Sequence, residues 1–444
     1  MARRRRRKKL PQGLFQAEIS SLSHEGRGIA QVNGKTTFID NALPNEIVEF
    51  SFTGSRAKFA EGIAEVISNP SDERVTPQCN HFGYCGGCSM QHMSPEAQLA
   101  HKQAVLIEQF EHLGKVKPET ILSPLSGPVW GYRHKARLAV KHVIKKEKTL
   151  VGFREKRSPF VADINSCEVL HPKVGKKLNA LADLIMSLNN HDQIPQIEVA
   201  ISETETALVI RHLTPLNSSD IERLRSFQTE HECRLYLQPG GYDTVHCLDT
   251  DDNLAMQYHL PEYDLNLSFL PTDFTQINVE INQRMISLAI NHLELNANDR
   301  VLDLFCGIGN FTLPMATIAK QVSGVEGDAG LIARAQENAR INDLNNVEFH
   351  VADLAAEELI YPFMSQQYNK LLLDPARTGA KEIISALNLK EIELIVYVSC
   401  NPATLARDAG ILVNEKGYRL RQAGIMDMFP RTSHVESIAV FHKQ

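Results

Sequence analysis

The sequence predicts a multidomain protein in which a small β-barrel, a central α+β region and an α/β region with a parallel sheet follow one another. Three observations indicate this order. Short strand-like segments crowd residues 14–66, cysteines cluster at residues 79–88, and helical and strand patterns alternate from residue 265 onward. The expected parts are a basic tail at residues 1–11, the barrel at 12–70, the central region at 71–264 and the α/β region at 265–444.

The barrel is expected from alternating segments at residues 15–19, 28–32, 37–39, 46–50 and 60–66. Asn33-Gly34 stands between the second and third of these, and this dipeptide is a strong signal for a type I′ hairpin turn. A small five-stranded barrel of this kind is OB-like, and such barrels commonly bind oligonucleotides. A barrel that only stabilises the chain remains the alternative.

Charge is distributed unevenly along the 444 residues. The formal net charge is -6, from 47 Lys and Arg against 53 Asp and Glu. Residues 3–9 carry +7 and residues 132–157 carry +8, which leaves about -21 on the remaining chain. Two basic segments on an acidic protein favour a localised anionic ligand. Since the sequence has neither a run of about 18 apolar residues nor an apolar stretch directly after the basic tail, we expect a cytoplasmic protein that contacts no membrane.

The central region has weaker patterns. Residues 95–115 carry apolar side chains near one face, which predicts a helix that packs on the α/β region. Residues 138–143 and 197–201 have the pattern of half-buried strands. The positions of these elements in the fold stay open at this point.

The α/β region begins with a cofactor-binding pattern. Residues 301–312 read as an apolar strand, a turn with Gly307 and Gly309, and a helix start, where backbone and ligand can approach closely. The next strand ends in Glu326, whose carboxylate can accept both hydroxyls of a ribose, and the third ends near Asp353, placed to meet an adenine. A single glycine pair favours S-adenosylmethionine over NAD, which usually requires G-x-G-x-x-G. A βα turn without a ligand remains the alternative.

A nucleophile is expected where the fifth strand, residues 394–398, runs into Ser399-Cys400-Asn401-Pro402. Ligands of open α/β sheets lie beyond the carboxyl ends of the strands, so Cys400 is expected to face the cofactor. A thiolate that adds to C6 of uracil makes C5 nucleophilic, and a base must later remove the C5 proton. Glu436 is the expected base, with His434 as second choice. A buried structural cysteine and a surface salt-bridged glutamate are the alternatives.

These motifs together resemble the RNA uracil-C5 methyltransferases that depend on S-adenosylmethionine. The resemblance is carried by residues 274–278, 303–310, 373–377, 399–402 and 434–436, and it implies a Rossmann-like methyltransferase domain. It implies Cys400 as nucleophile, Glu436 as proton acceptor, and Asp374 close to the reacting base. Many relatives have proline where this chain has Ala376. The implied cofactor-binding residues are Gln276, Phe305, Gly307, Gly309, Asn310, Glu326, Asp353 and Asp374.

Phe274 is a candidate for stacking on the target uracil, which must leave its helix or loop because C6 is attacked from the ring face. A core phenylalanine is the alternative. The basic segment supplies Arg133, Lys135 and Arg137 as further substrate-binding candidates that hold phosphates.

The cysteine cluster Cys79-x5-Cys85-x2-Cys88 places three thiols within ten residues, and four thiolates suit zinc or an iron-sulfur cluster. Cys167 is chosen as the fourth ligand because it follows the basic segment within the same expected domain, and Cys233 and Cys247 are rivals. Spacing alone does not select the metal, and merely buried cysteines remain the alternative. The resemblance to the ribosomal RNA members of the family implies a [4Fe-4S] cluster.

The combination of cluster and barrel narrows the expected substrate. The barrel resembles a TRAM domain, and the family member that has both features implies 23S ribosomal RNA as partner, with 5-methyluridine formed at position 1939. We expect a monomer. Cytosine methylation, another RNA site, and an RNA-binding assembly factor without activity are the alternatives.

Overall fold

The computed structural model describes residues 10–249, 255–356 and 358–444. The chain forms two compact units: the first extends to Lys102 and includes Arg431–His434, and the second comprises Gln103–Pro430 and Val435–Gln444. Residues 3–9 of the basic tail lie outside the described residues. The division into barrel, central and α/β domains stays a prediction, because the two compact units meet between Lys102 and Gln103 and not at the predicted domain boundaries.

The first unit contains a six-stranded sheet, in which only β4 and β6 run parallel. Asn33 and Gly34 both have positive φ angles, 51° and 72°, which confirms the type I′ turn. Ile39 and Phe50 lie in a buried apolar cluster inside the sheet. The short second strand was not expected. In the order β1-β5-β6-β4-β3-β2, the strands are β1 (Phe15–Glu18), β5 (Ile47–Ser55), β6 (Phe59–Ile67), β4 (Lys35–Asp40), β3 (Gly28–Val32) and β2 (Ser21–Leu22).

The expected helix over residues 95–115 is confirmed as α1 (Pro95–Gln109), which continues into a π-helical turn at Phe110–Gly114. Lys115 ends it in the left-handed conformation. Gly114 lies directly against α9 (Pro402–Asn414), because a Cβ at this position would stand 2.4 Å from the carbonyl oxygen of Ala406. This end of the helix therefore packs on the C-terminal sheet region.

The second unit contains a central six-stranded sheet whose two middle strands are each buried at every position but one. Ile197–Ile201 is buried at every position rather than half-buried, because its strand pairs on both sides and both faces are covered. Ala200 shares an apolar cluster with Phe269 and Ile308 of the glycine turn. In the order β13-β12-β11-β10-β8-β9, the strands are β13 (His246–Cys247), β12 (Arg234–Gln238), β11 (Thr206–Arg211), β10 (Gln196–Ile201), β8 (Lys135–Val143) and β9 (Lys148–Gly152). The sheet is accompanied by helices α2 (Pro172–Gly175), α3 (Leu178–Ser187) and α4 (Ser218–His231). A separate hairpin consists of β14 (Met256–Leu260) and β15 (Leu265–Phe269).

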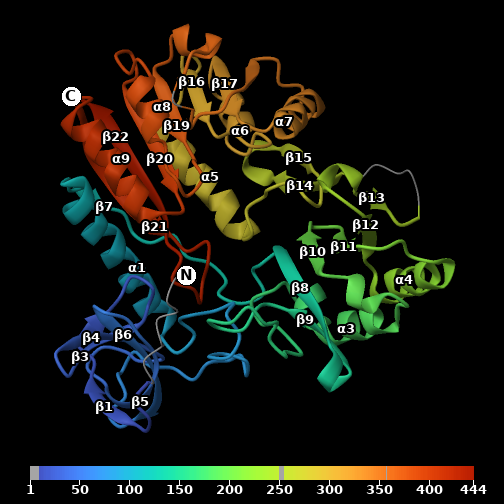
Figure 1. Ribbon diagram of the computed structural model, residues 1–444. Helices are drawn as coiled ribbons and strands as arrows, with labels where there is room; N and C mark the ends of the chain where they lie inside the picture. The colour runs from blue at the N-terminus through green and yellow to red at the C-terminus, as the bar shows by residue number, and fades with distance from the viewer. Residues whose placement is uncertain (1–9, 250–254, 357) are drawn as a thin grey trace, which may run out of the picture. The chain divides into compact units, whose positions relative to one another are not determined.

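The C-terminal sheet is a doubly wound α/β sheet, as the alternating pattern predicted (Figure 1). Its first five strands pair in parallel, and the last strand of the chain is inserted antiparallel between β20 and β21. β21 was not expected. In the order β18-β17-β16-β19-β20-β22-β21-β7, the strands are β18 (Val347–Val351), β17 (Gln321–Glu326), β16 (Arg300–Leu304), β19 (Lys370–Leu373), β20 (Leu394–Ser399), β22 (Glu436–Lys443), β21 (Tyr418–Met426) and β7 (Thr120–Ile121).

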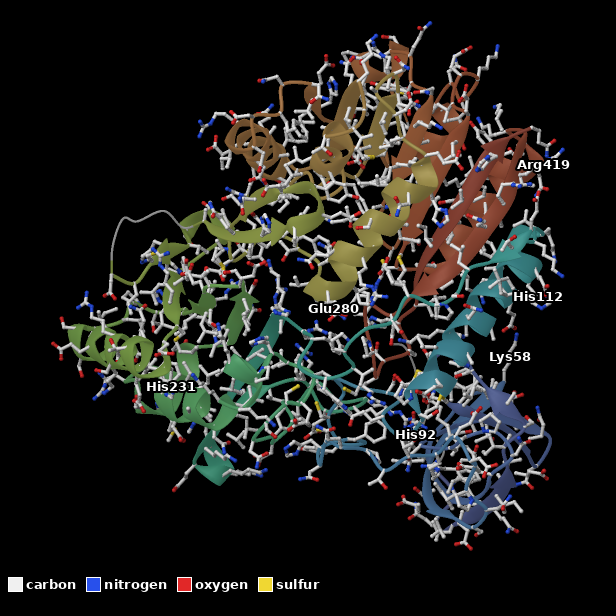
Figure 2. The ribbon with its side chains drawn as sticks, turned by 180° about the vertical axis from the view of Figure 1, so that it is seen from behind. Lys58, His92, His112, His231, Glu280 and Arg419 are labelled. Atoms are coloured by element: carbon white, nitrogen blue, oxygen red, sulfur yellow. The ribbon has the colours of Figure 1, made fainter. Side chains whose placement is uncertain are left out.

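Helix α5 (Val279–Leu293) joins this sheet to the segment that precedes it. Asn278 caps its N-terminus by accepting a hydrogen bond from the Ile281 amide, and Glu280 marks its first turn in Figure 2. Its apolar face packs into the large core of the sheet. The remaining helices are α6 (Thr312–Ala316), α7 (Ala329–Ile341) and α8 (Lys381–Ala386). Among the described residues, no helix has the length and apolar character needed to cross a membrane.

Candidate active site

The glycine turn after β16 has the backbone conformation that a close ligand approach requires. Gly307 and Gly309 have φ angles of 55° and 93°, and Phe305, although not glycine, is also left-handed at 68°. The amides of Phe305 and Cys306 both donate to the carbonyl oxygen of Val325, at 2.8 and 3.0 Å. Apart from its two chain neighbours, a Cβ on Gly307 would meet no atom of the described residues within 4 Å. The turn is therefore held against β17 and leaves open space beside Gly307.

A cavity of about 50 Å³ brings together most of the predicted cofactor-binding residues. They come from three segments of the chain: the one before α5, the glycine turn and the end of β19. The sequence-predicted residues in its lining are Phe274, Gln276, Phe305, Gly307, Asn310 and Asp374.

The two carboxylates expected to hold ribose and adenine lie at the strand ends where the sequence placed them, outside this lining. Glu326 accepts a hydrogen bond from the Gly307 amide at 3.2 Å and from the Gly327 amide at 2.7 Å. It thereby connects the ends of β16 and β17. Asp353 is exposed and accepts a bond from the Ala355 amide.

Asn310 is held by two side chains that the sequence reading missed. Asn282 on α5 exchanges two hydrogen bonds with it, at 2.9 and 3.1 Å, and the Tyr258 hydroxyl donates to the Asn310 side-chain oxygen at 2.8 Å. Asn282 is 5% exposed. Asn282 could have been found from the sequence, because it is an asparagine on the apolar face of a predicted helix. Nothing in the residues around Tyr258 marks it as a partner of Asn310.

The predicted nucleophile and the predicted base come from neighbouring strands. Strands β20 and β22 pair antiparallel up to Ser399 opposite Ser437, and the next residues along the two strands are Cys400 and Glu436. The Ser437 hydroxyl also donates to the Ser399 carbonyl oxygen at 3.1 Å. This register places Cys400 and Glu436 at the same sheet edge.

The charges at this edge influence one another. Burial, followed by the Glu436 and Asp374 carboxylates, raises the pKa of Cys400 to about 11, while Arg377 lowers it. Burial raises the pKa of Asp374 to about 7. Burial and Asp374 raise the pKa of Glu436 well above its ordinary value, and Glu436 is only 3% exposed. Buried Glu436 is therefore no surface salt-bridge residue.

Hydrogen bonds join the loop after β19 to the loop that carries the predicted nucleophile. The Asn401 side chain donates to the Arg377 carbonyl oxygen at 2.9 Å, and the Thr404 hydroxyl donates to the same oxygen at 3.3 Å. Asn401 also caps α9 by accepting from the Ala403 amide, and Pro402 is the first helical residue. The fixed φ angle of Pro402 and its missing N–H suit this position at the helix start.

Asp303 is a further buried carboxyl group beneath the glycine turn, and the sequence reading gave it no role. Burial raises its pKa to about 8, while the Thr312 hydroxyl lowers it by donating to Oδ2 at 2.5 Å. Its other oxygen has no hydrogen-bond partner within the described part of the chain. Asp303 therefore carries a proton at neutral pH.

The predicted substrate-binding residues lie along β8 and before α5. Phe274 is 71% exposed, so it is no core phenylalanine. Arg137 is exposed and pairs with Glu198 at 3.1 Å. The Arg133 side chain donates to the Lys135 carbonyl oxygen at 2.9 Å.

The four cysteines of the predicted cluster belong to different units. Cys79, Cys85 and Cys88 lie in the first unit and Cys167 in the second. The Gly87 amide donates to the Cys85 sulfur at 3.4 Å, and burial together with Cys79 raises the pKa of Cys85. Within the described residues, no group of three or more His, Cys, Asp or Glu side chains is arranged to hold a metal ion. The cluster therefore stays a prediction.

The other candidates have less support. Cys247 is buried in an apolar cluster with Tyr236 and Phe269, which suits a structural cysteine. Burial raises the pKa of Cys233 to about 11. His434, the second choice as base, belongs to the first unit, whereas Glu436 belongs to the second.

Comparison with known protein families shows to which family this chain belongs. The family model described as tRNA (Uracil-5-)-methyltransferase matches residues 95–444. The chain belongs to this family. The TRAM domain model matches residues 15–64, which confirms that the barrel is a TRAM domain.

Curated relatives of this family match along the whole chain. The 23S rRNA (uracil(1939)-C(5))-methyltransferase RlmD of Alcanivorax borkumensis is 52% identical over 440 residues, covering 99% of each chain. The protein of the same name from Nitrosococcus oceani is 52% identical over 445 residues, covering 100% of this chain and 99% of the relative. The predicted resemblance to RNA uracil-C5 methyltransferases is therefore confirmed.

A solved structure shares the fold. The Pyrococcus abyssi tRNA (uracil-54, C5)-methyltransferase, in complex with S-adenosyl-L-homocysteine, has a TM-score of 0.72 and 21% sequence identity. The match covers 96% of this chain and 100% of that one. This likeness confirms the methyltransferase fold of the C-terminal region.

Proposed function

We propose that this protein is an S-adenosylmethionine-dependent methyltransferase that forms 5-methyluridine at position 1939 of bacterial 23S ribosomal RNA. The single observation that carries the proposal is the register of β20 and β22, which places Cys400 and Glu436 at one sheet edge beside Asp374. Full-length relatives at 52% identity, named for this reaction, support the choice of substrate.

The cofactor site fits S-adenosylmethionine. The open space beside Gly307 admits a ligand, Glu326 stands at the end of β17 for the ribose hydroxyls, and Asp353 stands at the end of β18 for the adenine. Gln276, Phe305 and Asn310 from the cavity lining complete the binding set, together with Gly309 of the turn, which lies outside that lining. The cofactor supplies the methyl group to the activated ring.

The reaction begins with the sulfur of Cys400 adding to C6 of the uracil. Burial and two carboxyl groups keep this thiol protonated in the free enzyme, so its proton must leave as the sulfur–carbon bond forms. Asp374, with a pKa near 7, is partly ionised at neutral pH and can accept it. The electrons of the C5–C6 double bond move toward the C4 carbonyl, which makes C5 nucleophilic.

Glu436 completes the reaction as general base. After methyl transfer it takes the proton from C5, the double bond re-forms, and the bond to Cys400 breaks. A carboxylate of ordinary pKa is a weak base at neutral pH, and the raised pKa of Glu436 brings its basicity closer to the working range. Phe274, exposed beside the cavity, stacks on the flipped base.

RNA binding is assigned to the TRAM domain and to Arg133, Lys135 and Arg137 on or next to β8. Phosphate contacts from these cations supply affinity that falls with salt, while the base pocket supplies specificity. The protein acts as a cytoplasmic monomer.

The [4Fe-4S] cluster is proposed on Cys79, Cys85, Cys88 and Cys167. The thiolate donors fit a cluster in kind, and an N–H···S bond such as that from Gly87 to Cys85 is a common feature of such sites. The described side chains form no assembled group of three ligands, so the support is chemical rather than geometric. Iron and sulfide in an anaerobic preparation support the cluster, whereas stoichiometric zinc in a colourless protein contradicts it.

The function is tested by mapping methylated positions on 23S ribosomal RNA from a deletion strain complemented with wild-type protein or Cys400→Ala. We expect 5-methyluridine at position 1939 only with the wild type. Methylation by the variant contradicts the covalent mechanism, 5-methylcytosine indicates the related cytosine reaction, and RNA binding without turnover indicates an assembly factor.

A further inference from the structure

Tyr242 is an exposed aromatic side chain that the proposed function does not use. It lies in a one-turn 3₁₀ helix, Tyr242–Thr244, after β12, and it is 53% exposed. Its hydroxyl group is nevertheless held, because it donates to the Glu198 carboxylate at 3.2 Å and accepts a hydrogen bond from the Arg137 guanidinium. The polar end of the side chain is thus fixed to the central sheet while the ring stays accessible.

The two partners of this hydroxyl group are themselves held in place. Arg137 on β8 and Glu198 on β10 stand opposite each other in the antiparallel ladder, and the Arg137 Nε atom donates to Glu198 at 3.2 Å. The Gln196 side chain donates to the same carboxylate oxygen at 2.8 Å. Side chains of two paired strands therefore determine where the Tyr242 ring lies.

The turn that carries Tyr242 has hydrogen bonds of its own. The Thr244 hydroxyl group donates to the Gly241 carbonyl oxygen at 2.7 Å and accepts from the Gly240 amide at 3.0 Å. A tyrosine side chain has only two torsions, so a fixed turn and a fixed hydroxyl group leave the ring rigid. A rigid ring loses little conformational entropy when a planar group stacks on it.

The central sheet connects this ring with the proposed site of the target base. Glu198 and Ala200 are two residues apart on β10, so their side chains point to the same face of the sheet at a spacing of about 7 Å. Ala200 lines a cavity together with Thr275, which directly follows Phe274, the proposed stacking residue for the target uracil. An RNA strand whose uracil reaches Phe274 therefore passes close to Tyr242.

The charges around the ring favour an uncharged ligand. Arg137 and the nearby Lys135 are balanced by Glu198 and by Asp243, which directly follows Tyr242. Without an excess of positive charge, the ring itself does not select a phosphate, whereas a nucleobase is neutral and planar and stacks on aromatic side chains. Arg137, whose side chain is 59% exposed, can still contact a phosphate of the same strand.

We propose that the Tyr242 ring is a stacking platform for a second base of the RNA, close to the target uridine in the strand. This inference rests on the proposed function, since it assumes that the target uracil enters the site beside Phe274. When the uridine leaves its helix or loop, a neighbouring base loses a stacking partner, and the Tyr242 ring replaces it. The strand is then held at two bases, which fixes the position of the uracil relative to Cys400.

A fluorescent substitution tests the stacking directly. The chain contains one tryptophan, Trp130, so Tyr242→Trp adds a second emitter to a background that the wild type measures. The full-length variant is titrated with an RNA fragment that contains the target, intact or with a single abasic site moved along the flanking nucleotides. We expect RNA to quench the added fluorescence and one abasic position to abolish this quenching. Tyr361→Trp, at a tyrosine between β18 and β19, is the comparison variant and should show no quenching that depends on the abasic position.

Affinity measurements separate the ring from its anchor. Tyr242→Leu removes the ring and is expected to bind intact RNA about tenfold more weakly, with no further loss at the critical abasic position. Tyr242→Phe keeps the ring and loses the hydroxyl bonds, so we expect an intermediate affinity and an unchanged critical position. This variant keeps the test valid if Tyr242→Leu does not fold. Tyr361→Leu should bind RNA like the wild type.

Two results would overturn the proposal. One is fluorescence of Tyr242→Trp that RNA leaves unchanged or that no abasic site restores. The other is an abasic profile that is the same for Tyr242→Leu, Tyr242→Phe and the wild type, because the side chain would then serve only the fold of its turn.

Product analysis on the same RNA separates this inference from the proposed function. If the quenching depends on one abasic position but the wild type forms no 5-methyluridine, the proposed function fails while the stacking platform stands. If the wild type forms 5-methyluridine at position 1939 and the variants of Tyr242 change neither quenching nor affinity, the platform fails while the proposed function stands.

Discussion

The network around Asn310 allows a quantitative test of the proposed cofactor site. Asn282→Ala removes both hydrogen bonds that α5 makes to the Asn310 side chain and, among the described residues, leaves the bond from Tyr258. Asn310 can then rotate away from the orientation that it has in the cavity. We therefore expect weaker S-adenosylmethionine binding although the substituted residue carries no predicted cofactor contact.

The expected magnitude follows from the number of bonds. Each neutral hydrogen bond contributes about 1 kcal/mol net, so the loss of two costs about 2 kcal/mol. If this cost falls on the binding-competent orientation, the dissociation constant rises about 30-fold. Tyr258→Phe removes one bond and is expected to raise the constant about fivefold.

Isothermal titration with S-adenosylmethionine and urea unfolding are measured together. Asn298→Ala, at an exposed position before β16, is the matched control and is expected to leave both quantities unchanged. An Asn282→Ala variant whose cofactor affinity stays within twofold of the wild type while its free energy of unfolding falls would refute the reasoning, because the network would then be purely structural.

Three further predictions address the chemistry and the fold. Glu436→Gln removes the proposed base, so turnover should fall about 100-fold or more. A covalent RNA adduct should then accumulate and be detected on denaturing gels, whereas Cys400→Ala should form none. Rapid turnover of Glu436→Gln without an adduct would contradict this role. RNA affinity should decline as the pH rises through about 8, because Lys135 loses its charge there, and filter binding across pH should show no such step for Lys135→Met. Because burial raises the pKa of Asp303, the folded state should lose stability as the pH rises from about 4 toward 8; chemical denaturation should show a weaker pH dependence for Asp303→Asn, and an unchanged profile would contradict the buried proton.

Local sequence patterns predicted those elements whose structure depends mainly on residues close to them in the sequence. The Asn33-Gly34 turn formed because its two positive φ angles are available to this dipeptide almost without strain. The strand before Gly307 and the helix over 95–115 were likewise predicted from the spacing of their apolar residues and from the residues that flank them. By contrast, β21 escaped prediction, and the strand at 197–201 was expected to be half-buried, because burial depends on which segments cover each face.

The sequence by itself determined the residues on which the proposed chemistry depends: a cysteine after the fifth expected strand, a glutamate before the last one, and acidic strand ends in the expected cofactor-binding region. The tertiary structure decided what brings these groups together. Antiparallel pairing of β20 and β22 sets Glu436 beside Cys400, and burial sets the pKa values of both. Only the fold brought Tyr258 and Asn282 to Asn310 and left the Lys135 ammonium without a hydrogen-bond partner among the described residues, since such contacts depend on segments remote along the chain.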